Sequence, residues 1–143
     1  MYWYYNRYFY DNLFIDKKLS DCVGLFGATD KQSTIQNIVI KKAEVSGKNN
    51  TGMLVGLAKN SKKKNIKVQG KVSGTMPTGG LLGDCYFPKI VSSYWDMQTS
   101  MQSTSDGGEG RTSVEMFQRN NYQGWDFTKI WNIKEGEDYP FLR

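Results

Sequence analysis

A block of five residues that ends in glycine occurs three times in this 143-residue chain. The closing glycines stand at positions 27, 56 and 83, so they are 29 and then 27 residues apart. The three blocks are Val23–Gly27, Gly52–Gly56 and Gly79–Gly83. Recurrence at this distance indicates stacked repeats, because a single short unit cannot bury its apolar face alone.

Two further blocks follow each of the first ones in a constant order. They are Asn37–Ile40, Asn65–Val68 and Ser93–Asp96, then Val45–Gly47, Val72–Gly74 and Thr99–Met101. Apolar side chains alternate with their neighbours in these segments, as Ile38 and Ile40 do, and a period of two is typical of short, half-buried strands. A helix is disfavoured, because glycine and β-branched residues dominate.

The alignment of the blocks predicts which side chains lie over one another. The expected inward ladders are Leu25/Leu54/Leu81, Ile38/Ile66/Tyr94 and Val45/Val72, and the expected outward ladder is Val39/Lys67/Trp95. Asn37 and Asn65, with Ser93, fall at one position of the repeat, where side-chain amides can form a hydrogen-bonded ladder. The glycines of the first blocks suit tight corners with positive φ.

These features predict an all-β fold, a short parallel β-helix or solenoid of about three coils of 27–29 residues. Residues 1–21 form an N-terminal aromatic segment or cap in this interpretation, residues 22–101 the coils, and residues 102–143 a C-terminal capping region. An antiparallel meander or sandwich of the same strands is the alternative. The regularity of the repeats favours the solenoid.

The glycine-ending blocks, each followed by an Asn- or Ser-led apolar strand and a Val-Ser-Gly corner, resemble GLUG-motif repeats. The end of the chain, with Trp125–Phe127, Trp131–Ile133 and Tyr139–Arg143, resembles the segment that closes arrays of such repeats. This resemblance covers about residues 22–143. It implies a right-handed parallel β-helix, and a non-catalytic structural or adhesive module of a bacterial cell-surface or secreted protein.

The residue inventory argues against catalysis. The chain contains no histidine, which excludes Ser-His-Asp machinery and an H-E-x-x-H zinc site. The acids of the repeat region, Asp30, Glu44 and Asp84, are scattered, and no pair of carboxylates occupies equivalent positions in neighbouring coils. The GLUG family has no established catalytic residues to carry over. We therefore expect a non-enzyme with no cofactor.

Metal and disulfide signals are weak. The segment Gly107–Gly110 resembles half of a calcium-binding turn, but it is unrepeated and lacks the following aspartate, so a flexible loop is the favoured interpretation. Cys22 and Cys85 have no metal-binding or redox spacing. Two thiols are favoured over a disulfide.

Aromatic and basic residues are the candidate ligand contacts. In the alternative function, a carbohydrate-binding module, Trp95, Trp125 and Trp131 would stack on sugar rings. The competing interpretation places the C-terminal aromatic residues in a small core that closes the open edge of the solenoid. The expected partner is then a host or glycan surface ligand.

Lys62, Lys63 and Lys64 belong to a run of six lysines on the second coil, which could bind phosphate or sulfated glycans. A solvated turn whose charges discourage edge pairing is favoured instead. No aromatic residue is interleaved with these lysines, so we expect no nucleic-acid partner.

Eight aromatic residues lie between positions 2 and 14. The cluster in Tyr2–Tyr10 is too large to be wholly exposed in a monomer, so it is expected to cover the first coil or to dock on another chain by self-association. No run approaches the roughly 20 apolar residues of a membrane span. The first residues do not have the profile of a signal peptide. An extracellular or cell-surface location, which the resemblance implies, would then make this chain a fragment of a longer protein.

Overall fold

The computed structural model describes residues 4–143, with side chains from Asn6 onward, and it is mostly β. Its strands are β1 (Tyr4–Asp11), β2 (Phe14–Asp16), β3 (Phe26–Thr29), β4 (Thr34–Ser46), β5 (Thr51–Gly52), β6 (Val55–Lys59), β7 (Lys62–Ser73), β8 (Thr78–Gly79), β9 (Leu82–Tyr86), β10 (Lys89–Val91), β11 (Tyr94–Asp96), β12 (Glu109–Arg111), β13 (Trp131–Asn132) and β14 (Phe141–Leu142). The helices are α1 (Met97–Ser100), α2 (Ser113–Met116) and the 3-10 helix η1 (Arg119–Asn121).

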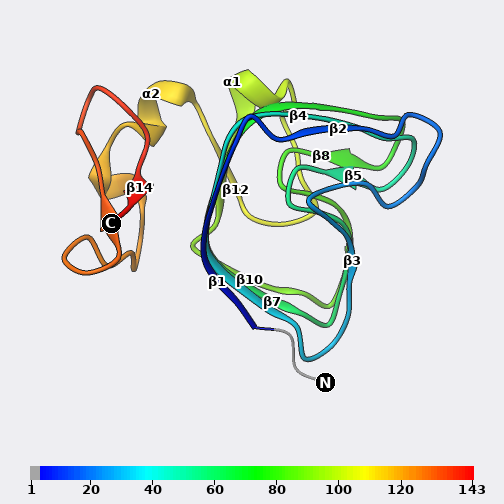
Figure 1. Cartoon of the computed structure of the whole chain (residues 1–143), viewed down its shortest axis with the longest axis horizontal. Helices are drawn as coiled ribbons and strands as arrows, with labels where there is room; N and C mark the ends of the chain where they lie inside the picture. Colours follow the sequence, from blue (N-terminus) through cyan, green and yellow to red (C-terminus); the bar gives the residue numbers. More distant parts are fainter. Residues whose placement is uncertain (1–3) are drawn as a thin grey trace.

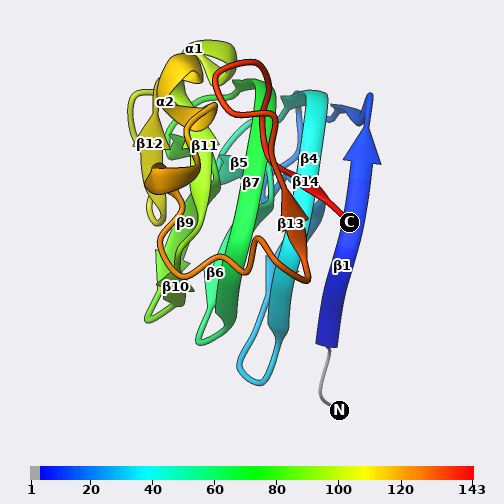
Figure 2. The same cartoon turned by 90° about the vertical axis from the view of Figure 1, so that its left-hand side faces the viewer.

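Parallel sheets arranged as a solenoid of about three turns make up the fold, as predicted. The largest sheet has the order β1-β4-β7-β11-β12, with β2 also on β4 and β10 also on β7. A second sheet is β3-β6-β9, and β5 pairs with β8. The coils superpose as nested loops in Figure 1, and Figure 2 shows β1, β4, β7 and β11 side by side.

The predicted register holds for the first two coils. Ile38 lies opposite Ile66, and Val45 opposite Val72. One extra residue of β4 between Ile40 and Ala43 forms a bulge. This bulge explains why the repeat is 28 residues long before this point and 27 residues long after it.

Within the third coil, β11 is shifted by one residue from the predicted register, whereas Leu81 follows Leu54 as predicted, since Val55 pairs with Leu82. Tyr94 pairs with Lys67 and Trp95 with Val68, whereas the alignment had placed Tyr94 beside Ile66 and Trp95 beside Lys67. A shift of one residue exchanges the two faces of a strand. Trp95 therefore belongs to the interior, and Tyr94 completes the outward ladder.

The interior of the solenoid is apolar, and the asparagine ladder follows one corner of it. Leu54, Ile66 and Leu81 are fully buried in the core cluster. The Asn65 amide donates to Oδ1 of Asn37 at 3.2 Å, and the Asn37 amide donates to Oδ1 of Asn6 at 2.7 Å. The Asn37–Asn65 part of the predicted ladder is thus present and extends into β1, whereas Ser93, which was predicted to join it, donates its hydroxyl to Val91 O instead. Asn37 and Asn65 both have positive φ, of 53° and 54°.

The repeat glycines have a different purpose from the one expected. None of the closing glycines has positive φ. Corners with positive φ are occupied by other residues, among them Asn37, Asn50 and Asn65. A Cβ at Gly56 would lie 2.4 Å from the carbonyl carbon of Cys22, and one at Gly83 would lie 2.4 Å from that of Asn50. These positions require glycine because the backbones approach closely.

The N-terminal strands continue the stack. β1 and β2 both pair in parallel with β4, so the described part of residues 1–21 extends the solenoid. Phe9 is 55% and Phe14 69% exposed. Tyr2 and Trp3, which belong to the predicted aromatic cluster, lie outside the described residues.

The C-terminal region departs from the prediction in its position. Residues 102–111 continue along the last coil, where Gly80 N donates to Thr104 O and β12 pairs with β11. Residues 112–143, the C-terminal unit, lie instead on the outward face of β4, β7 and β11 (Figures 1 and 2). The aromatic residues therefore cover a side of the solenoid.

Two local predictions in this region are wrong. Thr99–Met101 had been aligned with strand corners, but residues 97–100 form α1, whose first turn is capped by Asp96. Gly107–Gly110 had been interpreted as a loop, but its last two residues begin β12. Both deviations occur where the coil repeat ends.

The fold predicts a large loss of stability when the buried side chain of Leu54 is shortened. We expect Leu54→Ala to lower the free energy of unfolding by about 2–5 kcal/mol, because it removes a fully buried side chain and leaves a cavity. Urea unfolding followed by circular dichroism measures this loss. The matched control is Leu19→Ala, since Leu19 is 93% exposed and its truncation should cost less than about 0.5 kcal/mol. Equal losses in the two variants would contradict the proposed core.

Candidate functional site

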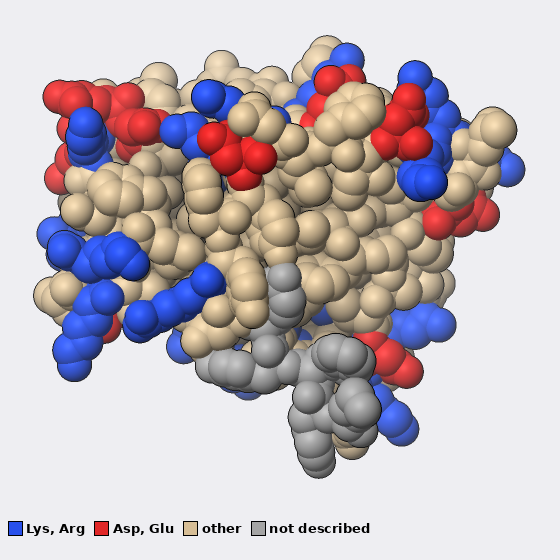
Figure 3. Space-filling model, in the orientation of Figure 1, with Lys and Arg blue, Asp and Glu red and all other residues tan. Residues whose placement is uncertain are grey.

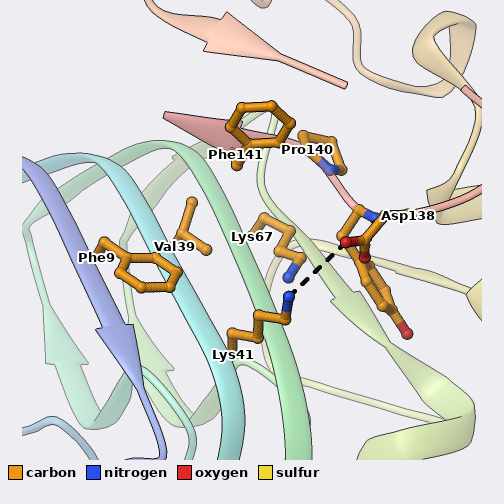
Figure 4. Close-up of a pocket in the computed structure, with 8 residues that line it drawn as sticks. Phe9, Val39, Lys41, Lys67, Asp138, Pro140 and Phe141 are labelled. Atoms are coloured by element: carbon orange, nitrogen blue, oxygen red, sulfur yellow. Dashed lines mark hydrogen bonds and ion pairs between the residues drawn. The ribbon is translucent and has the colours of Figure 1, made fainter. Parts of the chain in front are cut away.

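A cavity of about 160 Å³ lies between the outward face of the solenoid and the C-terminal unit. Its lining residues are Phe9, Val39, Lys41, Lys67, Asp138, Tyr139, Pro140 and Phe141. Figure 4 shows the amino groups of Lys41 and Lys67 pointing into the same space from the adjacent strands β4 and β7. The cavity thus combines charged groups with apolar walls.

Lys67 occupies the centre of this site and is completely buried. Burial lowers the pKa of its ammonium to about 7, and the nearby positive charge of Lys41 acts in the same direction. Its Nζ donates to Oε1 of Gln69 at 3.4 Å and lies 4.2 Å from the centre of the Tyr139 ring. An ammonium can donate three hydrogen bonds, so one long bond and a ring contact leave much of this capacity unused.

Tyr139 is held over Lys67 by Asp96. The Tyr139 hydroxyl donates to Oδ2 of Asp96, which also accepts a hydrogen bond from Ser113 Oγ at 2.7 Å. The other carboxylate oxygen accepts from the backbone N of Gln98 and Thr99. Desolvation and the bond to Asp96 raise the pKa of Tyr139 above its usual range. This network ties the last coil to the C-terminal unit.

Lys41 and Asp138 form the more open side of the cavity. Lys41 Nζ lies 3.8 Å from Oδ2 of Asp138, and both side chains are partly exposed. Phe9 and Phe141, which are 55% and 38% exposed, present aromatic carbon beside these charges. This arrangement suits noncovalent binding of a small group that has both a negative charge and an apolar surface.

The three tryptophans predicted to contact ligand are buried. Trp95, Trp125 and Trp131 are 5%, 7% and 0% exposed. Trp95 packs inside the solenoid, and Trp125 stacks on Trp131 with ring centroids 3.8 Å apart. None of them offers a ring face to a sugar, because each ring packs within a core. The C-terminal core predicted for Trp125 and Trp131 is present on the side of the solenoid.

The predicted lysine turn is a strand instead. Lys62, Lys63 and Lys64 begin β7, where Lys62 is exposed and Lys64 half-buried. Lys63 is completely buried and donates to Thr29 Oγ1 at 2.6 Å and to Ser61 Oγ. Desolvation lowers the pKa of Lys63 to about 8. On the face seen in Figure 3, acidic and basic side chains are interspersed.

The described residues contain no group of three or more Asp, Glu, Cys or His side chains that could hold a metal ion. Cys22 and Cys85 are both free. No helix within residues 4–143 is long and apolar enough to cross a membrane.

Sequence reasoning did not identify this cavity, which we call the lysine cavity because Lys41 and Lys67 line it. Lys67 had been placed in the outward ladder, and that placement is correct. Outward side chains of a solenoid are normally solvated, and covering by the C-terminal unit depends on contacts that no repeat pattern shows. A lysine between Val39 and Trp95 in the predicted outward ladder, which is otherwise apolar, was the available signal.

Comparison with known proteins shows limited similarity. Over 81 residues, or 57% of the chain, it is 38% identical to "Halomucin" of Haloquadratum walsbyi (strain DSM 16790 / HBSQ001). Over 122 residues, or 84% of the chain, it is 28% identical to a "Putative Gly-rich membrane protein" of Evansella cellulosilytica. The matches span 1% and 11% of those proteins. No family model and no solved structure matches the chain.

The buried lysines predict a pH-dependent stability. Because the folded-state pKa of Lys67 is about 7 and that of an unfolded lysine is about 10.4, the unfolded state binds more protons between these values. Stability should therefore rise with pH, by up to about 3 kcal/mol for this group from pH 7 to 9.5. Lys63 adds a smaller rise above pH 8.

Urea unfolding at several pH values from 6 to 9.5 measures this rise. Lys67→Met should remove most of it, whereas Lys71→Gln, which changes an exposed lysine of the same strand, should retain it. An unchanged slope in Lys67→Met would show that Lys67 is not buried as described.

Proposed function

We propose that this chain is a non-catalytic structural or adhesive repeat module of a cell-surface or secreted protein. The observation that supports this proposal most directly is the continuous stack of parallel coils, in which β1 pairs with β4 and β4 pairs with β7. Such a stack presents a stiff, repetitive surface whose side chains vary without disturbing the interior.

The similar proteins add support for a surface location. One is named "Halomucin" and the other "Putative Gly-rich membrane protein", and the chain matches only a small share of each. A module within a much longer surface protein would have this relationship to them. The GLUG-like blocks are consistent with that role, and we propose that the chain is a repeat of this type.

Absence of catalysis is part of the proposal. Among the described residues that line the lysine cavity, Asp138 supplies the one carboxylate. Asp96, a second acid near Lys67, is engaged by Tyr139, Ser113 and two backbone amides. The retaining and inverting glycosidase mechanisms require two free carboxylates across a substrate. The arrangement supports binding better than hydrolysis.

A surface role predicts that the protein is accessible on intact cells. Antibodies raised against the purified chain should label intact cells of the organism that makes it, or detect it in the medium, because a displayed scaffold must lie outside the membrane barrier. Flow cytometry with and without permeabilisation measures this accessibility. A cytoplasmic protein that is labelled only after permeabilisation provides the control. Labelling of the chain that also requires permeabilisation would refute the surface role.

Carbohydrate binding is the second candidate, and the lysine cavity is the observation that favours it. Its aromatic rim and buried amine replace the tryptophan platform as a place where a sugar could bind. Self-association through the N-terminal segment stays a prediction, to which the exposed Phe9 and Phe14 give some support.

A further inference from the structure

The lysine cavity has features that select among ligands. Two lysines from adjacent strands line it, and the buried one has no carboxylate within ion-pair distance among the residues described. Phe9, Val39, Pro140 and Phe141 supply apolar walls. We propose that this cavity binds a carboxylate-bearing sugar ring, a hexuronic acid residue of an acidic glycan, with the carboxylate on Lys41 and beside the buried ammonium of Lys67. This inference rests on the carbohydrate-binding candidate above.

The buried amine argues for a small anion. Lys67 is completely buried, and its nearest described polar contact is the 3.4 Å bond to Gln69. A charged group held out of water is costly unless it is paired. Because Lys67 has no exposed surface, a ligand carboxylate would form its charge-assisted hydrogen bond with Lys41 on the neighbouring strand. Its charge would then offset that of the Lys67 ammonium across the cavity wall.

The dimensions and walls of the cavity argue for one sugar ring. A volume of about 160 Å³ is well below the 300–1,000 Å³ of sites for drug-sized ligands. The exposed Phe9 and Phe141 lie at the rim, where a phenyl ring can cover the apolar C–H face of a pyranose. An inorganic anion would leave these rings without a contact, so the walls favour an organic acid.

The charges around Lys67 determine how binding depends on pH. Lys41 of β4 repels its proton, while Asp138 of the C-terminal unit, Asp96 of β11 and Asp11 of β1 attract it. The free protein has a Lys67 pKa of about 7, so a bound carboxylate should raise it and binding should take up a proton. Affinity should therefore fall as pH rises from 7 to 9, by up to about 50-fold if only the ammonium form binds.

Asp138 opposes the ligand. Its carboxylate lies beside Lys41 and would repel a second carboxylate in the cavity. Asp138→Asn keeps a side-chain oxygen for the Tyr139 backbone N, which it contacts at 2.8 Å. This substitution should therefore preserve local structure while removing the repulsion, and it should strengthen uronate binding by about 3- to 10-fold. A misfolded variant could not produce this gain.

The test is an NMR titration of the chain in 0.15 M NaCl. The probes are sodium D-glucuronate, sodium D-galacturonate and an oligogalacturonate, with D-glucose, a neutral cello-oligosaccharide and sodium acetate as comparisons. At pH 6.5 at least one uronate should bind at least tenfold more tightly than glucose or acetate and shift the signals of Lys67 and Phe141. Comparing the affinities of the monosaccharide uronates with that of the oligogalacturonate distinguishes a site for a single sugar from one that requires a longer glycan.

Three variants locate the site. Lys67→Met should reduce uronate affinity at least tenfold and remove its pH dependence. Lys41→Gln should weaken binding but retain the pH dependence. The control, Lys71→Gln, changes an exposed lysine of the same strand outside the cavity and should bind as the unaltered chain does.

Each outcome decides the proposal. Uronate binding that is unchanged in both Lys67→Met and Asp138→Asn would overturn the assignment to this cavity. Binding of the neutral oligosaccharide alone would overturn the uronate inference but leave the carbohydrate-binding candidate standing. No binding of any sugar at 20 mM would overturn both, whereas the surface role is tested separately by cell labelling.

Discussion

The stacking of equivalent strands in parallel register is the constraint on which the rest of this structure depends. In a strand, neighbouring side chains alternate between faces, so pairing Ile38 with Ile66 directs Val39 and Lys67 to the opposite face together. The interior then requires apolar residues at fixed positions, and the glycines allow the coils to approach one another. The outward positions are free to differ, which is where the molecule places its unusual residues.

The repeated part of the fold could be predicted from the sequence, because repetition is visible as spacing. The ladder of Asn37 and Asn65 and the pairs of the first two coils were assigned correctly. Strand β11 of the third coil was not, since Ser92 has positive φ of 46° and takes the corner position that alignment had given to Ser93. A one-residue difference of this kind leaves little trace in a short apolar strand, yet it moved Trp95 from the surface to the interior.

The candidate site could not be predicted for a different reason. Its groups come from β1, β4, β7 and the C-terminal unit, and they meet only because that unit lies on the side of the solenoid. The aromatic residues of the chain end indicated a small core but gave no information on where it would pack. Burial of Lys67 beneath Tyr139 is therefore a property of docking, and the ligand chemistry follows from it.

The lateral position of the C-terminal unit also has a mechanical consequence. The hydrogen bonds between coils run along the stack, so tension on the two ends of a solenoid would separate its coils one pair at a time. The unit bridges β4, β7 and β11 through Val39, Lys67 and Tyr94, and it is linked to the last coil by Asp96. Separating those coils requires the aromatic core to slide or detach in the same event. The C-terminal unit should therefore make the mechanical unfolding of these coils more cooperative.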